Sequence, residues 1–417
     1  METRAMWRRY FDLGLGGVLL VGAAACIRAG EPKPELPVRV EHKLLADLGG
    51  EHIAQAICRR GRGGEMALVG WGDRILEWAR MGGAHREVFP AVEGFAYSNG
   101  GCALDVDGDG ADEVVIARGA GRWCNRPKLY WFREGSSGVW TEHLAAETGL
   151  GASSPHNILP LSFAGPRPAR GVVVLADRRS IEWYEIPADP KAPWIRHPIA
   201  TLPKANQSGL KIGDIAGRGR PDLVCGTYWA ECPADPLQEP WAVHRYGQWE
   251  GEFGGMDQLA LADLDGDGRL EIVAAEAEIP DSRLAVFTRD PRAPDGAWKC
   301  SEIDRGLYCP HSLVVADLDG DGRPDIVAGE MSAGGWKFPL HDNPRIYAYF
   351  NRGGGRFEKR VLWEGEGVHE MGMLPRREGG PVVLFAADET QTWKIPDMKT
   401  HVNLWTISLQ GSIGRRN

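Results

Sequence analysis

The chain of 417 residues lacks the short motifs by which many enzyme classes are identified. It contains no Gly-x-Ser-x-Gly turn, no phosphate-binding loop and no dinucleotide fingerprint, so hydrolase-triad, kinase and dehydrogenase functions are disfavoured. It contains no Cys-x-x-Cys pair, which leaves zinc-ribbon and thiol-redox chemistry with little support. No basic stripe is present and acids outnumber bases by 57 to 48, so nucleic acid is not expected as a partner.

The apolar run near the N-terminus, Leu13 to Ala25, is too short to span a bilayer. It follows three arginines and precedes small residues, a pattern typical of an export signal over residues 1–29. We therefore expect an extracytoplasmic protein, whether secreted, periplasmic or at the cell surface. Cys26 follows three alanines, and lipid attachment there is the single route to a membrane that the sequence leaves open.

Export would also permit disulfides. Cys225 with Cys232, and Cys300 with Cys309, are close enough in sequence to pair locally. Seven cysteines remain beyond Cys26, so at least one thiol is expected to stay unpaired.

One acidic, glycine-rich loop occurs in three copies, at residues 105–113, 263–271 and 317–325. Each copy has acids at positions 1, 3, 5 and 9 and runs into an apolar strand. Carboxylates this crowded repel by about 4 kcal/mol per pair at 4 Å and an effective dielectric of 20. The loop therefore predicts a hard cation with oxygen ligands, and calcium fits best. The expected ligands are Asp105, Asp107, Asp109, Glu113, Asp263, Asp265, Asp267, Glu271, Asp317, Asp319, Asp321 and Asp325.

The spacing excludes an EF-hand. That loop needs a bidentate Glu at position 12 between two helices. Here position 12 is Ile116, Ala274 or Ala328, within segments that suit a strand. The acid at position 9 must replace the missing Glu, so the sequence predicts a strand–loop–strand cation site.

Degenerate copies of the loop extend the repeat along the chain. Asp214 to Asp222 keeps the frame but has Arg218 where the third Asp would stand, so that its charge could replace the ion. Three further copies open on a histidine and have no acid cluster. The seven units start near residues 52, 99, 156, 208, 257, 311 and 369.

Each unit contains four short strand patterns and no helical periodicity, which predicts an all-β, seven-bladed β-propeller with four-stranded blades. The last unit lacks its fourth strand, and the N-terminal segment Val38–Leu45 fits that place. Such sharing between the chain ends closes the ring and removes exposed strand edges. The expected domains are a signal at 1–29, a linker at 30–37, the propeller at 38–409 and a tail at 410–417.

The pattern Asp-x-Asp-x-Asp-Gly-x-x-Asp/Glu before an apolar strand resembles the FG-GAP or VCBS repeats. Repeats of this family form integrin α-subunit propellers and occur in exported bacterial proteins and propeller-type polysaccharide lyases. The resemblance covers about residues 38–409 and implies calcium at the acidic loops, while the activity stays open. The literal Phe-Gly motif is nearly absent, and Phe253-Gly254 is its best trace.

In such a blade the face opposite the acidic loops collects the starts of the first strands and the ends of the second strands. The first-strand starts form a polar column with four of the chain's 11 histidines. Its members are His52, Asn99, His156, Ser208, Asp257, His311 and His369. These histidines can brace neighbouring blades, bind a ligand or a divalent metal, or act as acid and base.

Indoles and acids are expected to flank this column, as in sites where sugars stack on aromatic faces and carboxylates hold hydroxyls. The loops after the second strands contribute Trp123, Tyr228, Trp229, Trp241, Trp336 and Trp393. Trp78, Trp183 and Trp405 lie in third strands and are expected to pack between blades. The expected ligand-binding residues are His52, Arg118, Asp257, Glu276, Glu330, Trp336 and His369.

The sequence leaves three functions open. The first is a binding module that holds a carbohydrate or an extracellular protein. The second is a carbohydrate-active lyase or dehydratase in which His156 and His311 act as acid and base, and Arg118 or a bound cation stabilises the enolate. The third is a scaffold that docks a larger exported complex through blade edges.

Overall fold

The repeating unit expected from the sequence is present as seven four-stranded antiparallel sheets. The computed structural model describes residues 37–49, 53–61, 64–71, 74–79, 85–89, 92–121, 123–147, 149–164, 168–247, 257–290, 292, 297–332, 339–376, 379–388 and 399–409. Across these ranges the regular structure is entirely β, in 28 strands. The expected signal, linker and C-terminal tail lie outside the described residues, apart from Pro37. None of the described residues belongs to a helix that could cross a membrane.

The strands follow chain order within the blades. Blade 1 is β2 (Ile53–Gly61), β3 (Gly64–Trp71), β4 (Arg74–Ala79) and β5 (Arg86–Phe89), and blade 2 is β6 (Phe95–Leu104), β7 (Glu113–Ala120), β8 (Asn125–Glu134) and β9 (Trp140–Ala146). Blade 3 is β10 (Ile158–Phe163), β11 (Ala169–Ala176), β12 (Ser180–Glu185) and β13 (Ile195–Thr201), and blade 4 is β14 (Lys211–Gly213), β15 (Asp222–Cys225), β16 (Tyr228–Glu231) and β17 (Ala242–Arg245).

The second half of the chain repeats this plan. Blade 5 is β18 (Asp257–Ala262), β19 (Glu271–Glu276), β20 (Ser282–Arg289) and β21 (Trp298–Leu307), and blade 6 is β22 (Ser312–Ala316), β23 (Asp325–Gly329), β24 (Arg345–Asn351) and β25 (Phe357–Glu364). Blade 7 combines β26 (Glu370–Met373), β27 (Val382–Ala387) and β28 (Lys399–Leu409) with the N-terminal strand β1 (Val38–Gly49). The prediction of seven blades is confirmed, and each begins within a few residues of the expected start.

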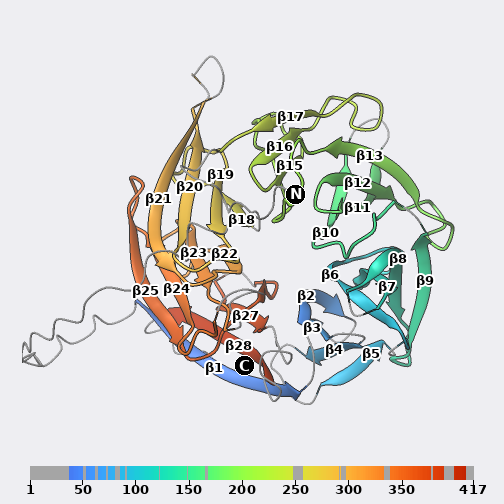
Figure 1. Cartoon of the computed structure of the whole chain (residues 1–417), viewed down its shortest axis with the longest axis horizontal. Coiled ribbons are helices and arrows are strands. Elements are labelled where there is room, and N and C mark those ends of the chain that lie inside the picture. Colours follow the sequence, from blue (N-terminus) through green and yellow to red (C-terminus); the bar gives the residue numbers. More distant parts are fainter. Residues whose placement is uncertain are drawn as a thin grey trace, which may run out of the picture. The chain divides into compact units, whose positions relative to one another are not determined.

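The blades are arranged around a common axis, with first strands such as β6, β10 and β22 inside and fourth strands such as β9, β13 and β25 outside (Figure 1). Neighbouring first strands contact one another, as β2 does with both β6 and β26. The sheets therefore form a seven-bladed β-propeller.

The N-terminal strand completes the last blade, as expected. β1 pairs with β28 in an antiparallel register that runs from Val38 opposite Leu409 to Gly49 opposite Lys399. Val38 is 2% exposed, and it packs in the cluster that contains Trp405 and Ile407. The two ends of the propeller thus share one sheet, in which β1 is the outer strand.

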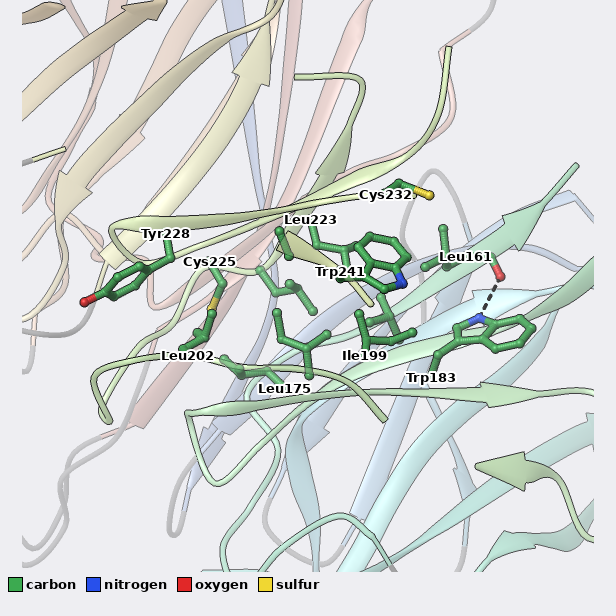
Figure 2. Packing of buried hydrophobic residues seen from close by; sticks show 14 of the residues in the cluster. Leu161, Leu175, Trp183, Ile199, Leu202, Leu223, Cys225, Tyr228, Cys232 and Trp241 are labelled. Carbon is green, nitrogen blue, oxygen red and sulfur yellow. Dashed lines mark hydrogen bonds between the residues drawn. The ribbon is translucent and has the colours of Figure 1, made fainter. Parts of the chain in front are cut away.

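Apolar side chains fill the space between adjacent blades. Between blades 3 and 4, Leu161 and Leu175 face Leu223, while Trp183 and Trp241 lie at the same interface (Figure 2). The indole nitrogen of Trp183 donates a hydrogen bond to the Leu161 carbonyl at 3.1 Å (Figure 2). Trp78 and Trp405 are also buried, which agrees with the prediction that third-strand indoles pack between blades.

The two local cysteine pairings that the sequence permits are not formed. Cys225, Cys232, Cys300 and Cys309 are all thiols. Cys225 lies opposite Tyr228 at the turn of the β15–β16 hairpin, whereas Cys232 follows the far end of β16. At about 3.3 Å per residue along a strand, these two positions are roughly 13 Å apart, beyond the Cα separation of about 7 Å that a disulfide tolerates.

Candidate functional site

Each acidic loop is folded around its first aspartate. Asp105 Oδ1 accepts the amide proton of Gly108 at 2.6 Å, and Asp105 Oδ2 accepts that of Gly110 at 3.0 Å. Both glycines have positive φ, 80° and 89°, a conformation that residues with a Cβ rarely adopt. Asp263 and Asp317 accept the equivalent bonds in blades 5 and 6. The Asp-x-Asp-Gly-Asp-Gly pattern therefore encodes this turn locally.

The acid at position 9 reaches back into the loop from the start of the second strand. Glu113, Glu271 and Asp325 are 2%, 3% and 0% exposed. Each accepts a backbone amide proton from the second loop residue, at 2.7 to 2.8 Å. Carboxylate oxygens from positions 1, 3 and 9 lie within 4.8 Å of one another in every copy. The geometry thus supplies three converging oxygens per loop.

Burial makes the ionised position 9 acid unfavourable in the absence of a cation. It raises the pKa of Glu113 and Glu271 to about 7 and that of Asp325 to about 6, and charges of the neighbouring aspartates act in the same direction. A divalent cation would reverse both effects, because it favours the charged form of every ligand. The donor set fits calcium, which takes carboxylate and carbonyl oxygens.

The three loops differ in what lies beside them. In blade 2, Arg133 contacts Asp107 at 2.5 Å, and in blade 6, Arg352 contacts Asp319 at 2.6 Å. Within the described part of the chain, no ion pair reaches the aspartates of the blade 5 loop, residues 263–267. A cation entering the blade 5 loop therefore displaces no basic side chain among the described residues.

Blade 4 contains the same turn without the acid cluster. Asp214 accepts amide protons from Arg218 and Gly219 at 2.8 and 2.7 Å. The buried Asp222 accepts that of Ala216 at 2.8 Å, as Asp325 does from its own loop. Arg218, which replaces the third aspartate, pairs with Glu231. The turn can therefore form without a full set of ligands, so its shape alone does not identify a cation site.

At the other end of the first strands, two histidines of the polar column lie together. His311 precedes β22 and His369 precedes β26, and their rings stack with centroids 4.2 Å apart and planes inclined by 16°. They are 6% and 5% exposed. Nδ1 of His311 lies 2.8 Å from the carbonyl oxygen of His369, within hydrogen-bond distance. Adjacent first strands thus position both imidazoles at the axis.

Acids lie beside both nitrogens of His311. Glu278, which follows β19, has Oε1 3.5 Å from Nε2, and Glu370 has Oε1 3.9 Å from Nδ1. The amide nitrogen of Gln258 lies 3.4 Å from Nδ1. These residues come from blades 5, 6 and 7. We call His156, Lys211, Glu278, His311, His369 and Glu370 the axial cluster.

Electrostatic interactions extend the axial cluster to blades 3 and 4. Burial lowers the pKa of Lys211 in β14 and raises that of Glu370 in β26, while the attraction between the two opposes both shifts. The hydrogen bond with His311 and the positive charges of His311 and Arg178 hold the pKa of Glu278 below its usual value against the effect of burial. His156 in turn interacts with both Glu278 and His311. Five of the seven blades therefore contribute ionisable groups to the axial cluster.

The two predicted catalytic histidines have opposite pKa shifts. Burial lowers the pKa of His156 to about 4, and the positive charge of Arg178 acts in the same direction. Burial would also lower the pKa of His311, but the hydrogen bond with Glu278 and the charge of Glu370 raise it to about 9. Near neutral pH, His156 is therefore neutral and His311 is protonated.

Other expected ligand-binding residues lie apart from the axial cluster or outside the described residues. Arg118 makes a bidentate pair with Glu142 at 2.6 and 2.7 Å, and its guanidinium lies over Tyr130. Buried Glu276 pairs with Arg283, and buried Glu330 accepts amide protons from Tyr308 and Arg345. Arg118 thus joins strands within blade 2, while Glu276 and Glu330 are engaged by neighbouring backbone and side-chain groups of blades 5 and 6. His52, Trp336 and the side chain of Asp257 lie outside the described part of the chain.

Of the four residues of the expected aromatic rim that the structure describes, three are packed inside. Tyr228, Trp229 and Trp241 are 5%, 3% and 8% exposed. Tyr228 and Trp229 belong to β16 rather than to a loop, because the β15–β16 connection is only two residues long. Trp123 is 37% exposed and follows β7 on the face expected to bind ligands. Trp393 lies outside the described residues.

Sequence reasoning did not identify Glu278, Lys211 or Glu370 as site residues. Glu370 directly follows His369 of the polar column, and Lys211 interrupts an apolar first strand. Both positions could therefore have been recognised from the sequence. Glu278 lies in the β19–β20 loop, and its approach to His311 reveals its place in the cluster.

Comparisons with known proteins agree with this architecture. Residues 263–328, which contain the loops of blades 5 and 6, match the FG-GAP-like repeat family. The propeller is similar to the crystal structure of an ancestral GH74 enzyme, with a TM-score of 0.55 and 11% identity. That similarity covers 87% of this chain but 48% of the other, so the chain spans about half the length of that enzyme. A comparison with curated proteins finds no match. The chain is thus a β-propeller whose residues 263–328 match the FG-GAP-like repeat family, and the resemblance expected from its acidic loops is confirmed there.

Proposed function

We propose that the protein is an exported, calcium-stabilised propeller that binds a carbohydrate at the face carrying the axial cluster. The observation that carries the proposal is the gathering of ionisable groups from five blades at the starts of the first strands. Strands such as β22, five residues long, separate these groups from the acidic loops. The acidic loops would then bind cations at one end of the blades, and the axial cluster would recognise the ligand at the opposite end.

The chemistry of this face suits a polyhydroxylated ligand. Carboxylates of Glu278 and Glu370 can accept hydrogen bonds from hydroxyls, and Lys211 can donate one. Trp123 offers a partly exposed indole on which a sugar ring can stack. The similarity to the GH74 enzyme concerns the fold alone, so the proposal is supported by these side chains.

Binding is tested with the calcium-loaded protein on a glycan array, followed by calorimetry with the best ligand. We expect Trp123→Ala to weaken binding by roughly 3- to 10-fold, since aromatic contacts contribute about 0.5–1.5 kcal/mol beyond area burial and 1.4 kcal/mol is tenfold. Ile195→Ala, which removes an exposed apolar side chain from an outer strand, serves as the matched control. Absence of a retained glycan on a panel that includes acidic polysaccharides would refute carbohydrate binding.

A second candidate function is an eliminating lyase acting on uronic polysaccharides. It is favoured by the opposite pKa shifts of His156 and His311, because paired titratable groups with separated pKa values suit base and acid roles. Neutral His156 would take the proton next to the sugar carboxylate. The electron pair left behind forms the carbon–carbon double bond, the carbon–oxygen bond breaks, and His311 protonates the leaving oxygen.

The lyase is tested by incubation with uronic polysaccharides and measurement of the ultraviolet absorbance of the unsaturated product. His156→Ala is expected to lower the rate by about 100-fold or more, since general acid–base catalysis contributes roughly 10²–10⁴. His143→Ala alters an imidazole that stacks on Trp131 in blade 2 and should leave the rate unchanged. A product signal that survives both His156→Ala and His311→Ala would remove this assignment.

A further inference from the structure

We propose that His311, His369 and Glu370 form a binding site for one transition-metal ion, with Zn²⁺ as the reference ion. One ligand atom from each side chain lies within 4.8 Å of the other two. Two imidazoles and a carboxylate are a donor set typical of zinc sites that keep a coordination position open. The site is distinct from the acidic loops, which offer carboxylates alone.

Modest side-chain movement would bring the three ligands to bonding distance. Zinc takes imidazole nitrogens and carboxylate oxygens at about 2.0–2.2 Å, so ligand atoms around a tetrahedral ion are about 3.4 Å apart. The stacked rings of His311 and His369 would turn from their inclination of 16° so that one nitrogen of each points to the ion. Glu370 already has Oε1 3.9 Å from His311 Nδ1.

Neighbouring groups support such a site. The two nitrogens of His311 have different surroundings, with Glu278 Oε1 3.5 Å from Nε2 and the His369 carbonyl 2.8 Å from Nδ1. Histidines that bind metals usually donate their other ring proton to a carboxylate or a backbone carbonyl, and both kinds of acceptor are present here. Glu278 beside Nε2 would hold the ring of His311 when Nδ1 faces the ion.

The alternative is that the stacked histidines only brace blades 6 and 7. Elsewhere in the described chain, imidazoles that stack between strands lie on indoles, as His143 does on Trp131 and His244 on Trp229. His311 and His369 instead stack on each other beside two acids. Two imidazoles beside carboxylates are too polar to pack well as an apolar contact between blades. They are suitable metal ligands, because imidazole binds zinc, copper, iron and nickel.

The experiment is a titration of the full-length chain, freed of transition metals, with Zn²⁺ and separately with Co²⁺. Excess calcium is kept present so that the acidic loops do not take up the added ion. We expect one equivalent of zinc by calorimetry, and visible absorption bands of four- or five-coordinate cobalt. His311→Ala and His369→Ala should each abolish this equivalent. Glu370→Gln replaces a charged ligand and should weaken binding by at least about 100-fold, since changing even an outer partner of a metal ligand costs roughly 10- to 100-fold.

The matched control is His143→Ala, which removes a stacked imidazole elsewhere and should retain the full equivalent. Failure of the wild-type chain to take up zinc stoichiometrically overturns the proposal, whatever the variants do. An equivalent that persists in folded His311→Ala and His369→Ala also overturns it, because the ion would then be bound elsewhere. The test needs no glycan, so its outcome is separate from that of the carbohydrate proposal.

Discussion

Chelation of calcium is expected to lower the melting temperature of the protein by roughly 15 °C. A site held at 100 times its dissociation constant stabilises the folded state by about 2.7 kcal/mol, so three independent sites contribute about 8 kcal/mol. For a chain of this size, 1 kcal/mol corresponds to about 2 °C. The measurement is thermal denaturation, followed by circular dichroism, in excess calcium and in excess chelator.

A matched pair of buried aspartates separates the effect of the ion from that of the turn. Asp325 accepts amide protons from Leu318 and Asn351, both at 2.8 Å, in an acidic loop. Asp222 accepts equivalent bonds at 2.8 and 2.7 Å in the blade 4 loop, which has Arg218 in place of an acid. We expect Asp325→Asn to remove about a third of the calcium-dependent shift. Asp222→Asn should lower the melting temperature equally with and without calcium.

Two results would contradict this account. One is a melting temperature that chelator leaves unchanged, which would mean that the acidic loops fold and hold without a cation. The other is an equal rise in melting temperature with magnesium. A loop that coordinates the larger calcium ion with flexible geometry should bind the smaller magnesium ion less well. The first result would mean that the three loops, like the blade 4 turn, need no cation. The second would mean that they bind divalent cations without preferring calcium.

The fold could be predicted from the sequence because its information is local and repeated. The aspartates of each loop accept bonds from amides only three to five residues away, so the Asp–Gly pattern defines the turn by itself. The apolar segments on either side then become the first two strands of a blade. Repetition supplied the number of blades, and the missing fourth strand of the last unit predicted the role of β1.

The candidate ligand face was less predictable, because it depends on contacts between distant parts of the chain. His311 and His369 are 58 residues apart, and their stacking follows from the placement of adjacent first strands around the axis. Part of the expected rim of indoles is buried for a related reason. A short hairpin in blade 4 makes Trp229 a strand residue, and its ring is then buried.

Deletion of residues 38–49 is expected to abolish cooperative folding of the propeller. β1 is paired with β28 along its length, and Val38 and Leu48 are 2% and 8% exposed. Each fully buried side chain of this kind contributes about 1.5–3 kcal/mol. Together with the lost strand pairing, this approaches the whole stability of a typical domain, about 5–15 kcal/mol. The shortened chain should aggregate, because β28 then presents an unpaired edge.

A circular permutant distinguishes closure of the ring from a need for β1 at the N-terminus. Leu409 lies opposite Val38 in the antiparallel register, so a short turn can join the end of β28 to the start of β1. A chain that begins at residue 50 and carries residues 38–49 after such a turn would make blade 7 a continuous four-stranded sheet. We expect this permutant to be monomeric by size-exclusion chromatography and to melt within about 5 °C of the natural order, since a short surface loop changes stability by only about 1 kcal/mol. A deletion variant that melts like the intact protein would show that β28 tolerates an open edge. A permutant that aggregates would show that β1 must precede blade 1 in the chain. Closure of the ring would then depend on the order in which the strands fold, and strand pairing alone would not be sufficient.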